Sequence, residues 1–113
     1  MPKVDLLTDL DDFTPAAESA FREIFARFDA DGDGALSPAE VDAFAVAANG
    51  EKFDKATHAE LVSSFETTAA GFLTLAGFLD MLHLQSLADP EETWKDLATL
   101  GYAEDLTLLV VNQ

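Results

Sequence analysis

The sequence predicts an all-α domain in which two helix–loop–helix units are followed by a fifth helix. Five segments open with a side chain that can cap a helix, and three of those side chains precede a proline, which is favoured at the first helical position. A pattern of apolar residues and glycine recurs after 37 residues, so that Phe28 corresponds to Phe65 and Gly34 to Gly71. Alternation of apolar and polar residues over the length of a strand is absent before Leu106. These observations together favour helices arranged as a repeated unit.

The helix start signals give the order of the elements. Ser37 is followed three residues later by Glu40, which is the capping-box pattern, and Gly101 is suited to end the last helix. We expect helices over 15–28, 38–48, 55–65, 75–87 and 90–100. The expected caps are Thr14, Ser37, Asp54 or Thr57, Thr74 and Asp89. The flanking segments 1–13 and 102–113 are expected to form arms, of which the first could be a short helix and the second could add a strand.

Composition limits the classes of function. The chain of 113 residues carries 22 acidic and 6 basic side chains, a formal net charge of −16, and 49% of its residues are apolar. Its length predicts a single domain, 1–113, with a core of its own. Because phosphate groups are bound by lysine and arginine, the charge argues against nucleic acid as a partner. We expect a monomer.

Other features predict a soluble, cytoplasmic protein. The sequence contains no cysteine, which removes disulfides and thiolate metal sites. Its first residues lack the apolar run of a signal peptide. The longest apolar stretch, 69–88, is interrupted by Asp80, His83 and Gln85, so it is interpreted as a buried helix and not as a membrane span.

The segment 29–40 has the residue pattern of a calcium-binding loop. Aspartate stands at its first, third and fifth positions, glycine at the sixth and glutamate at the twelfth, which is the EF-hand spacing. Alternating aspartates direct their carboxylates at one centre, and the glycine permits the sharp turn there. The predicted ligands of one Ca²⁺ are Asp29, Asp31, Asp33, the Ala35 carbonyl, Ser37 through a water molecule, and Glu40. Magnesium is the expected competitor for these oxygen atoms.

Two other interpretations of this loop have less support. A chance acidic turn would not be expected to have two amphipathic helices beside it and Leu36 in register at the eighth position, pointing toward Leu73 of the second unit. Catalysis by paired carboxylates would need convergent histidine, serine or lysine side chains, which the motif lacks. We therefore expect no enzymatic activity.

The second loop, 66–77, keeps the turn glycine Gly71 and the leucine at position 8. It lacks carboxylates at positions 3, 5 and 12, where Thr68, Ala70 and Gly77 stand. One remaining carboxylate, Glu66, and weak hydroxyl ligands do not replace the hydration shell of calcium. The second unit, 54–87, is therefore predicted to be a degenerate hand that covers the apolar face of the first, 14–48, with a weak second site as the alternative.

The phenylalanines of the first unit lie at helical spacings. They are Phe21, Phe25 and Phe28 on the entering helix and Phe44 on the exiting helix. We expect them to form the core. Alternatively, some of them line a peptide groove, because the groove of paired EF-hands is their partly opened core.

The segment 89–101 contains the single tryptophan of the chain. Trp94, Leu97, Ala98 and Gly101 are spaced at i, i+3, i+4 and i+7, which predicts one apolar stripe on the fifth helix. A large aromatic side chain on a short amphipathic helix is a typical anchor in a hydrophobic groove. We therefore predict that this helix plugs the groove of its own chain. The alternative is a plain fifth helix packed elsewhere.

The order of these parts resembles the EF-hand modules of the mitochondrial Rho GTPases (Miro). The likeness covers about 13–106, and its most specific parts are the segments 71–78 and 92–102, followed by acidic residues and Leu106. The resemblance implies a hidden, non-binding second hand and a ligand-mimic helix that lies in the hydrophobic groove. The sequence contains neither GTPase domain of that family and no membrane anchor, so mitochondrial transport does not carry over. It fits either a fragment or a free-standing module.

The leading functional hypothesis is a calcium-binding regulatory module in which the ion alters the contact of the plug helix. Calcium buffering by the same site, without a conformational switch, is one alternative. A protein-interaction module that uses calcium only for stability is another. An unidentified protein partner would bind through the groove.

Overall fold

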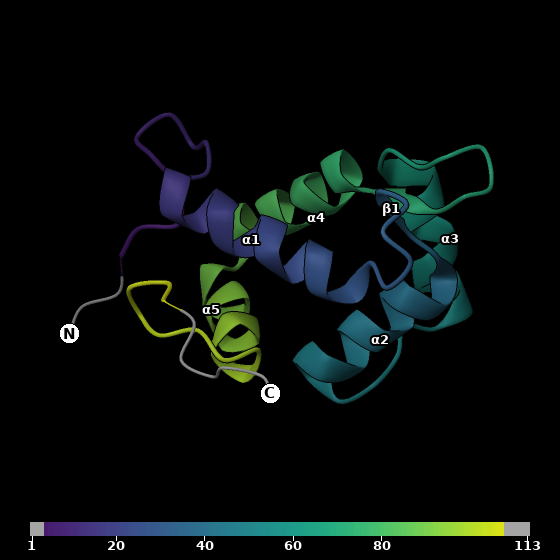
Figure 1. Ribbon diagram of the computed structural model, residues 1–113. Coiled ribbons are helices and arrows are strands. Elements are labelled where there is room, and N and C mark those ends of the chain that lie inside the picture. Colours follow the sequence, from purple (N-terminus) through teal and green to yellow (C-terminus); the bar gives the residue numbers. More distant parts are fainter. Residues whose placement is uncertain (1–3, 108–113) are drawn as a thin grey trace.

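The computed structural model describes residues 4–107 and contains the five expected helices (Figure 1). The first helix–loop–helix unit consists of α1 (Pro15–Phe28) and α2 (Pro38–Asn49). The second consists of α3 (Lys55–Ser64) and α4 (Leu75–Ala88), and α5 (Pro90–Thr99) follows it. Each helix begins where the start signals place it, and each end lies within one residue of the expected end. This arrangement is consistent with an EF-hand fold.

Side-chain caps fix the helix starts. Ser37 and Glu40 form the predicted capping box at α2, with the Glu40 amide donating to Ser37 Oγ at 3.3 Å and the Ser37 amide donating to Glu40 Oε1 at 2.9 Å. At α3 the cap is Asp54 and not Thr57, because the Thr57 amide donates to Asp54 Oδ1 at 2.8 Å. Satisfying these amides is the local reason why the helices begin at these residues.

A two-stranded antiparallel sheet joins the two loops. In this sheet β1 (Ala35–Leu36) pairs with β2 (Leu73–Thr74), and Leu36 stands opposite Leu73. Both leucines are buried, so the predicted pairing of the position-8 residues is confirmed. The sheet thus connects the two loops directly through their backbones.

The helices enclose one apolar core. Phe21, Phe25 and Phe44 are buried, and Phe28 is half-buried and packed against the core. Phe78 of α4 is fully buried and lies edge-on to the rings of Phe25 and Phe44, at centroid distances of 5.5 and 5.2 Å. The two units therefore share these aromatic contacts.

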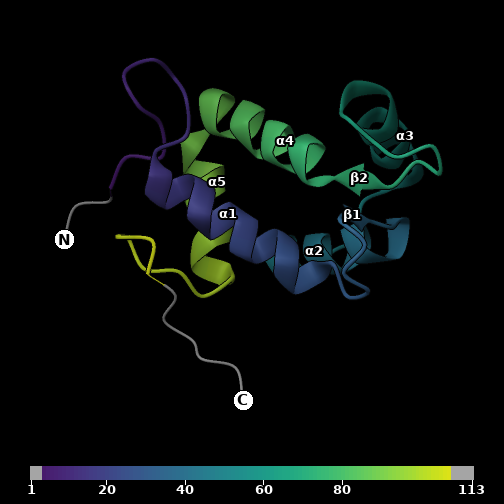
Figure 2. The same ribbon diagram turned by 45° about the horizontal axis from the view of Figure 1, so that its top comes forward.

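The fifth helix and the terminal segments complete one end of the domain. Figures 1 and 2 show α3 and α5 at opposite ends of α4, and α5 packs on α4 and α2. The Val4 amide donates to the Glu104 carbonyl at 2.9 Å, which joins the two arms. Residues 4–13 form no helix, although Leu6 is buried. Most of the possible strand after Leu106 lies outside the described residues.

Tyr102 connects the segment that follows α5 to α1. It is buried, and its hydroxyl donates to Glu23 Oε1 at 2.6 Å. Burial, aided by this contact with Glu23, raises the pKa of Tyr102 to about 12. The unfolded chain loses the same proton near pH 10. The folded protein therefore holds the proton more tightly than the unfolded chain does.

We expect this difference to appear as a pH dependence of stability. The contribution of Tyr102 is complete below about pH 10 and is lost as the pH rises toward about 12. Urea denaturation should show a steeper decline in the free energy of unfolding over this range for the parent than for Tyr102→Phe. Because the chain has one tyrosine, phenolate absorbance reports its titration directly. A native-state midpoint at the ordinary tyrosine value would contradict this account.

Candidate metal centre

Four carboxylates of the first loop converge in space. Asp29, Asp31, Asp33 and Glu40 each provide one oxygen, and these oxygens all lie within 4.8 Å of one another. Within residues 4–107 no other group of three or more histidine or acidic side chains has such an arrangement. The convergence makes this loop the candidate metal centre.

Backbone amides hold the aspartates in place. Asp29 follows α1 directly, and its Oδ2 accepts from the Gly34 amide at 2.9 Å. The Asp33 amide donates to Asp31 Oδ1 at 3.3 Å, so the loop backbone curls around its own side chains. Gly34 has a φ of 85°, a left-handed conformation that side chains rarely adopt, which explains the requirement for glycine at this turn.

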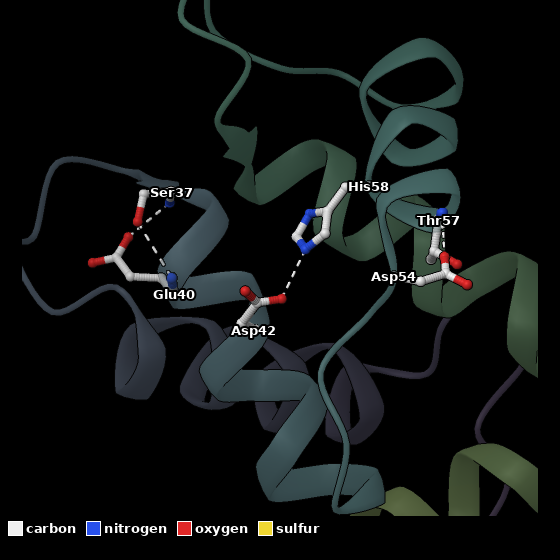
Figure 3. A network of polar contacts seen from close by, with 6 residues as sticks. All are labelled: Ser37, Glu40, Asp42, Asp54, Thr57 and His58. Atoms are coloured by element: carbon white, nitrogen blue, oxygen red, sulfur yellow. Dashed lines mark hydrogen bonds and ion pairs between the residues drawn. The ribbon is translucent and has the colours of Figure 1, made fainter.

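Glu40 connects the start of the loop to its end. It stands in the first turn of α2, and its Oε2 accepts from the Ala30 amide at 2.9 Å. Its Oε1 accepts from the Ser37 amide at 2.9 Å, the contact drawn beside the capping bond in Figure 3. Glu40 therefore combines two tasks, closing the loop and capping α2.

The electrostatics of the loop fit a hard cation. Loss of water around Asp31 raises its pKa, and repulsion from Asp33 and Glu40 adds to the rise. Desolvation also acts to raise the pKa of Asp29, yet hydrogen bonds, foremost that from the Gly34 amide, outweigh it and leave the pKa lowered. Asp29 Oδ1 is buried and has no hydrogen-bond partner among the described residues. A divalent ion would relieve the repulsion and give this oxygen a partner.

The two other predicted ligands lie on the same loop. Ala35 is buried in β1, and Ser37 is the half-buried cap of α2. Ser37 stands between the carboxylate cluster and α2, and its Oγ accepts from the Glu40 amide.

The second loop closes differently. The Glu66 carbonyl accepts from both the amide and the hydroxyl of Thr74, each at 3.2 Å. The first and ninth residues of this loop therefore bond directly. In the first loop the connection runs instead through the Glu40 side chain, whose oxygens accept from the Ala30 and Ser37 amides.

Gly77 explains this tight closure. A Cβ atom at Gly77 would lie 2.3 Å from the Glu66 carbonyl oxygen and 2.9 Å from Leu73 Cδ1. Real Cβ atoms essentially never approach backbone so closely. The position that corresponds to Glu40 therefore has no room for any side chain, which the sequence alone did not reveal.

The fifth helix faces the hands with a different stripe from the predicted one. Leu97 is buried, but Ala98 is exposed, and Gly101 lies half-buried beyond the helix end. Trp94 is half-buried beside the N-terminal segment, where it lines a cavity of about 290 Å³ with Val4–Leu7. The tryptophan is therefore half-buried beside the N-terminal arm and packed against the edge of the core.

The buried stripe consists of Thr93, Asp96, Leu97 and Leu100, which have the spacing i, i+3, i+4 and i+7. It faces Phe21 and Ile24 of α1, Phe44 of α2 and Leu82 of α4. A search for apolar residues alone misses this stripe because half of it is polar. The polar members contact α4, where Gln85 Nε2 donates to Thr93 Oγ1 at 3.0 Å and to Asp96 Oδ2 at 3.1 Å.

Because of the close approach at Gly77, we expect a glycine-to-alanine change there to lower the stability of the protein, the opposite of its usual effect in a helix. Replacing glycine by alanine in an ordinary helix stabilises a protein by about 1 kcal/mol. Here we expect Gly77→Ala to lower the free energy of unfolding by about 1–3 kcal/mol, because the added methyl group overlaps the Glu66 backbone. Gly77→Glu should be at least as destabilised and should bind no second ion.

Urea denaturation followed by circular dichroism measures the change, and calorimetry counts the ions. Ala76→Glu is the matched control, because Ala76 is the neighbouring exposed residue on α4. A gain in stability for Gly77→Ala, or a second bound calcium in Gly77→Glu, would show that the loop is not closed as described.

Comparison with known proteins gives matches to EF-hand proteins. No protein-family model matches the chain. The chain is 34% identical over 98 residues to EF-hand calcium-binding domain-containing protein 7 of Xenopus laevis, covering 84% of this chain and 16% of that protein. It is 37% identical over 82 residues to mitochondrial Rho GTPase 2 of Arabidopsis thaliana, covering 73% and 12%. It is 32% identical over 91 residues to mitochondrial Rho GTPase 1 of Gibberella zeae, covering 80% and 14%.

The chain thus spans less than a fifth of the length of these relatives. The similarity is limited to EF-hand regions. None of the helices among residues 4–107 is long and apolar enough to cross a bilayer. The predicted resemblance is confirmed, at about 35% identity over most of the chain: the protein is a homologue of EF-hand calcium-binding domains, including the EF-hand region of the mitochondrial Rho GTPases.

Proposed function

We propose that the chain is a regulatory module that binds one calcium ion in the loop 29–40. The observation that supports this most directly is the convergence of four carboxylate oxygens within 4.8 Å of one another. Asp29 also has a buried Oδ1 without a hydrogen-bond partner among the described residues. The ion would be held by Asp29, Asp31, Asp33, the Ala35 carbonyl, Ser37 through water, and Glu40. Such a set of hard oxygen ligands suits calcium, with magnesium as the competitor.

The proposal of a single ion rests on the second loop. Its only acidic residue is Glu66, whose backbone carbonyl is bonded to Thr74, and Gly77 leaves no room for a twelfth-position carboxylate. We therefore assign the hand at 54–87 the role of a structural partner. Through β1 and β2 it holds the first loop from one side.

Glu40 provides the link from ion binding to structure. Its two oxygens accept from the Ala30 and Ser37 amides, at the start of the loop and at the cap of α2. A bidentate contact with calcium would use the same two oxygens, so that ion binding and the capping of α2 would depend on one side chain. That helix packs on α5, and its Phe44 faces Leu97 across their interface. A change at the start of α2 can therefore reach α5 through a packed element.

We further propose that α5, within the segment 89–101, is an intramolecular occupant of the groove between the hands. Leu97 and Leu100 are buried against side chains of α1, α2 and α4. A partner protein would bind by displacing α5. Between α2 and α3 lies an open apolar cavity of about 390 Å³, lined by Leu36, Val41 and Val62 among others and by no residue of α5.

The proposed function is binding and not catalysis. The acidic cluster contains no histidine, and the GTPase activity that two relatives carry in their names is not transferred to a chain that spans 12–14% of them. Calcium buffering, and a role of calcium in stability alone, are the outcomes that the following experiments separate.

Calorimetric titration with calcium at physiological magnesium tests the site. We expect one ion per chain for the parent. Glu40→Gln should bind calcium at least about ten-fold more weakly, because it removes a charged bidentate ligand. Glutamine still suits the third helical position of a capping box, so the fold is kept. Glu51→Gln, which changes an exposed linker residue, is the matched control and should bind as the parent does. Absence of calcium heat, or unchanged binding in Glu40→Gln, would refute the site.

Trp94 fluorescence separates a sensor from the alternatives. The chain has one tryptophan, and it lies on α5. A regulatory module should change its Trp94 emission in proportion to bound calcium. A buffer should bind calcium with hardly any change in emission. A module that needs calcium only for stability should instead lose its helical circular dichroism when a chelator is added.

A further inference from the structure

The buried face of α5 contains a carboxylate that ion binding does not use. Asp96 is 6% exposed and lies in the middle of the stripe that contacts the hands. Its Oδ2 accepts from Gln85 Nε2 at 3.1 Å. Its Oδ1 is buried and has no hydrogen-bond partner among the described residues. A buried, unpartnered acceptor of this kind destabilises the state that buries it.

The surroundings of Asp96 offer little compensation. The adjoining cavity measures about 10 Å³, at the lower limit for one water molecule, and the side chains that α1, α2 and α4 contribute to it are apolar. From α4, the polar contact to Asp96 is the neutral amide of Gln85. The charged groups of the described chain that act on Asp96 are Glu92 and Lys95 of α5 itself, and they have opposite signs.

We propose that Asp96 weakens the contact between α5 and the two hands. On this proposal α5 occupies the groove releasably and is not a permanent part of the core. This proposal rests on the proposed role of α5. In the docked state Leu97 and Leu100 stabilise the contact while Asp96 opposes it. In the released state water solvates the carboxylate, and the penalty disappears. A partner helix without a carboxylate at this place could then compete for the same groove.

The buried Asp96 carboxylate also makes the contact between α5 and the hands depend on pH. Burial raises the pKa of Asp96, and the charge of Glu92 acts in the same direction against the bond from Gln85 and the charge of Lys95. Released α5 exposes Asp96 to water, where its pKa returns to the ordinary value. The docked state therefore binds the proton more tightly, and docking strengthens as the pH falls through the raised pKa.

The contacts of Asp96 allow a clean substitution. Gln85 Nε2 also donates to Thr93 Oγ1 at 3.0 Å, so it keeps a partner when Asp96 is removed. Asp96→Asn removes the charge and keeps the shape, whereas Asp96→Leu replaces the carboxylate by an apolar group of similar size. Glu91→Gln, at an exposed position of the same helix, controls for the loss of one negative charge.

Amide hydrogen exchange of the full chain, saturated with calcium, measures the docking of residues 90–99. At neutral pH we expect both Asp96 variants to protect α5 roughly ten-fold more strongly than the parent, and Glu91→Gln to resemble the parent. After correction for intrinsic exchange, lowering the pH should raise the protection of the parent toward that of Asp96→Asn. The Asp96 variants should lose this dependence.

Two results would overturn the inference in different ways. If α5 opens on its own but Asp96→Asn and Asp96→Leu leave its protection unchanged or reduce it, Asp96 does not limit docking, and the proposed role of α5 survives. If α5 of the parent exchanges only together with α1 and α4, α5 is a fixed part of the core, and the proposed role of α5 fails as well.

Discussion

Repulsion among four carboxylates held within 4.8 Å is the constraint on which the rest of this structure depends. The loop does not avoid it, because the amides of Gly34, Ala30 and Ser37 draw the acidic oxygens together. Such a cluster is tolerated only if solvent screens it or a cation neutralises it. On the proposed function, the stability of the first hand is thus coupled to ion binding. Through the capping role of Glu40, the same coupling extends to the start of α2.

The loop of the second hand closes differently from that of the first. Its first and ninth residues are joined directly, because the Glu66 carbonyl accepts from both the amide and the hydroxyl of Thr74, and Gly77 leaves room for this closure. The short sheet then connects a closed loop to a charged one. On the proposed function, a response to calcium would begin in the first hand, whose helix α2 packs on α5. The two loops differ in carboxylates at three ligand positions, and at the twelfth, which is Glu40 in one loop and Gly77 in the other, the second loop also has no room for a side chain.

Features determined by local chemistry could be predicted from the sequence. The five helices begin at their caps because a cap needs only the next three residues, and the aspartates of the first loop converge because the spacing of an EF-hand loop is local. The face of α5 could not be predicted in the same way. Thr93 and Asp96 are buried because Gln85 of α4 meets them, a tertiary contact that no periodicity of apolar residues contains. The clash that excludes a side chain at Gly77 likewise depends on the fold.

The central claim is that one of two related loops binds the ion. Gly34 and Gly71 occupy the same position in the two loops and have the same φ of 85°, so their backbone amides form an internal pair of reporters. A calcium titration followed by nuclear magnetic resonance of these two amides tests the claim most directly. The account predicts that the Gly34 resonance shifts and saturates at one ion per chain, with no comparable shift for Gly71. Comparable shifts of both amides, or no shift of Gly34, would contradict it.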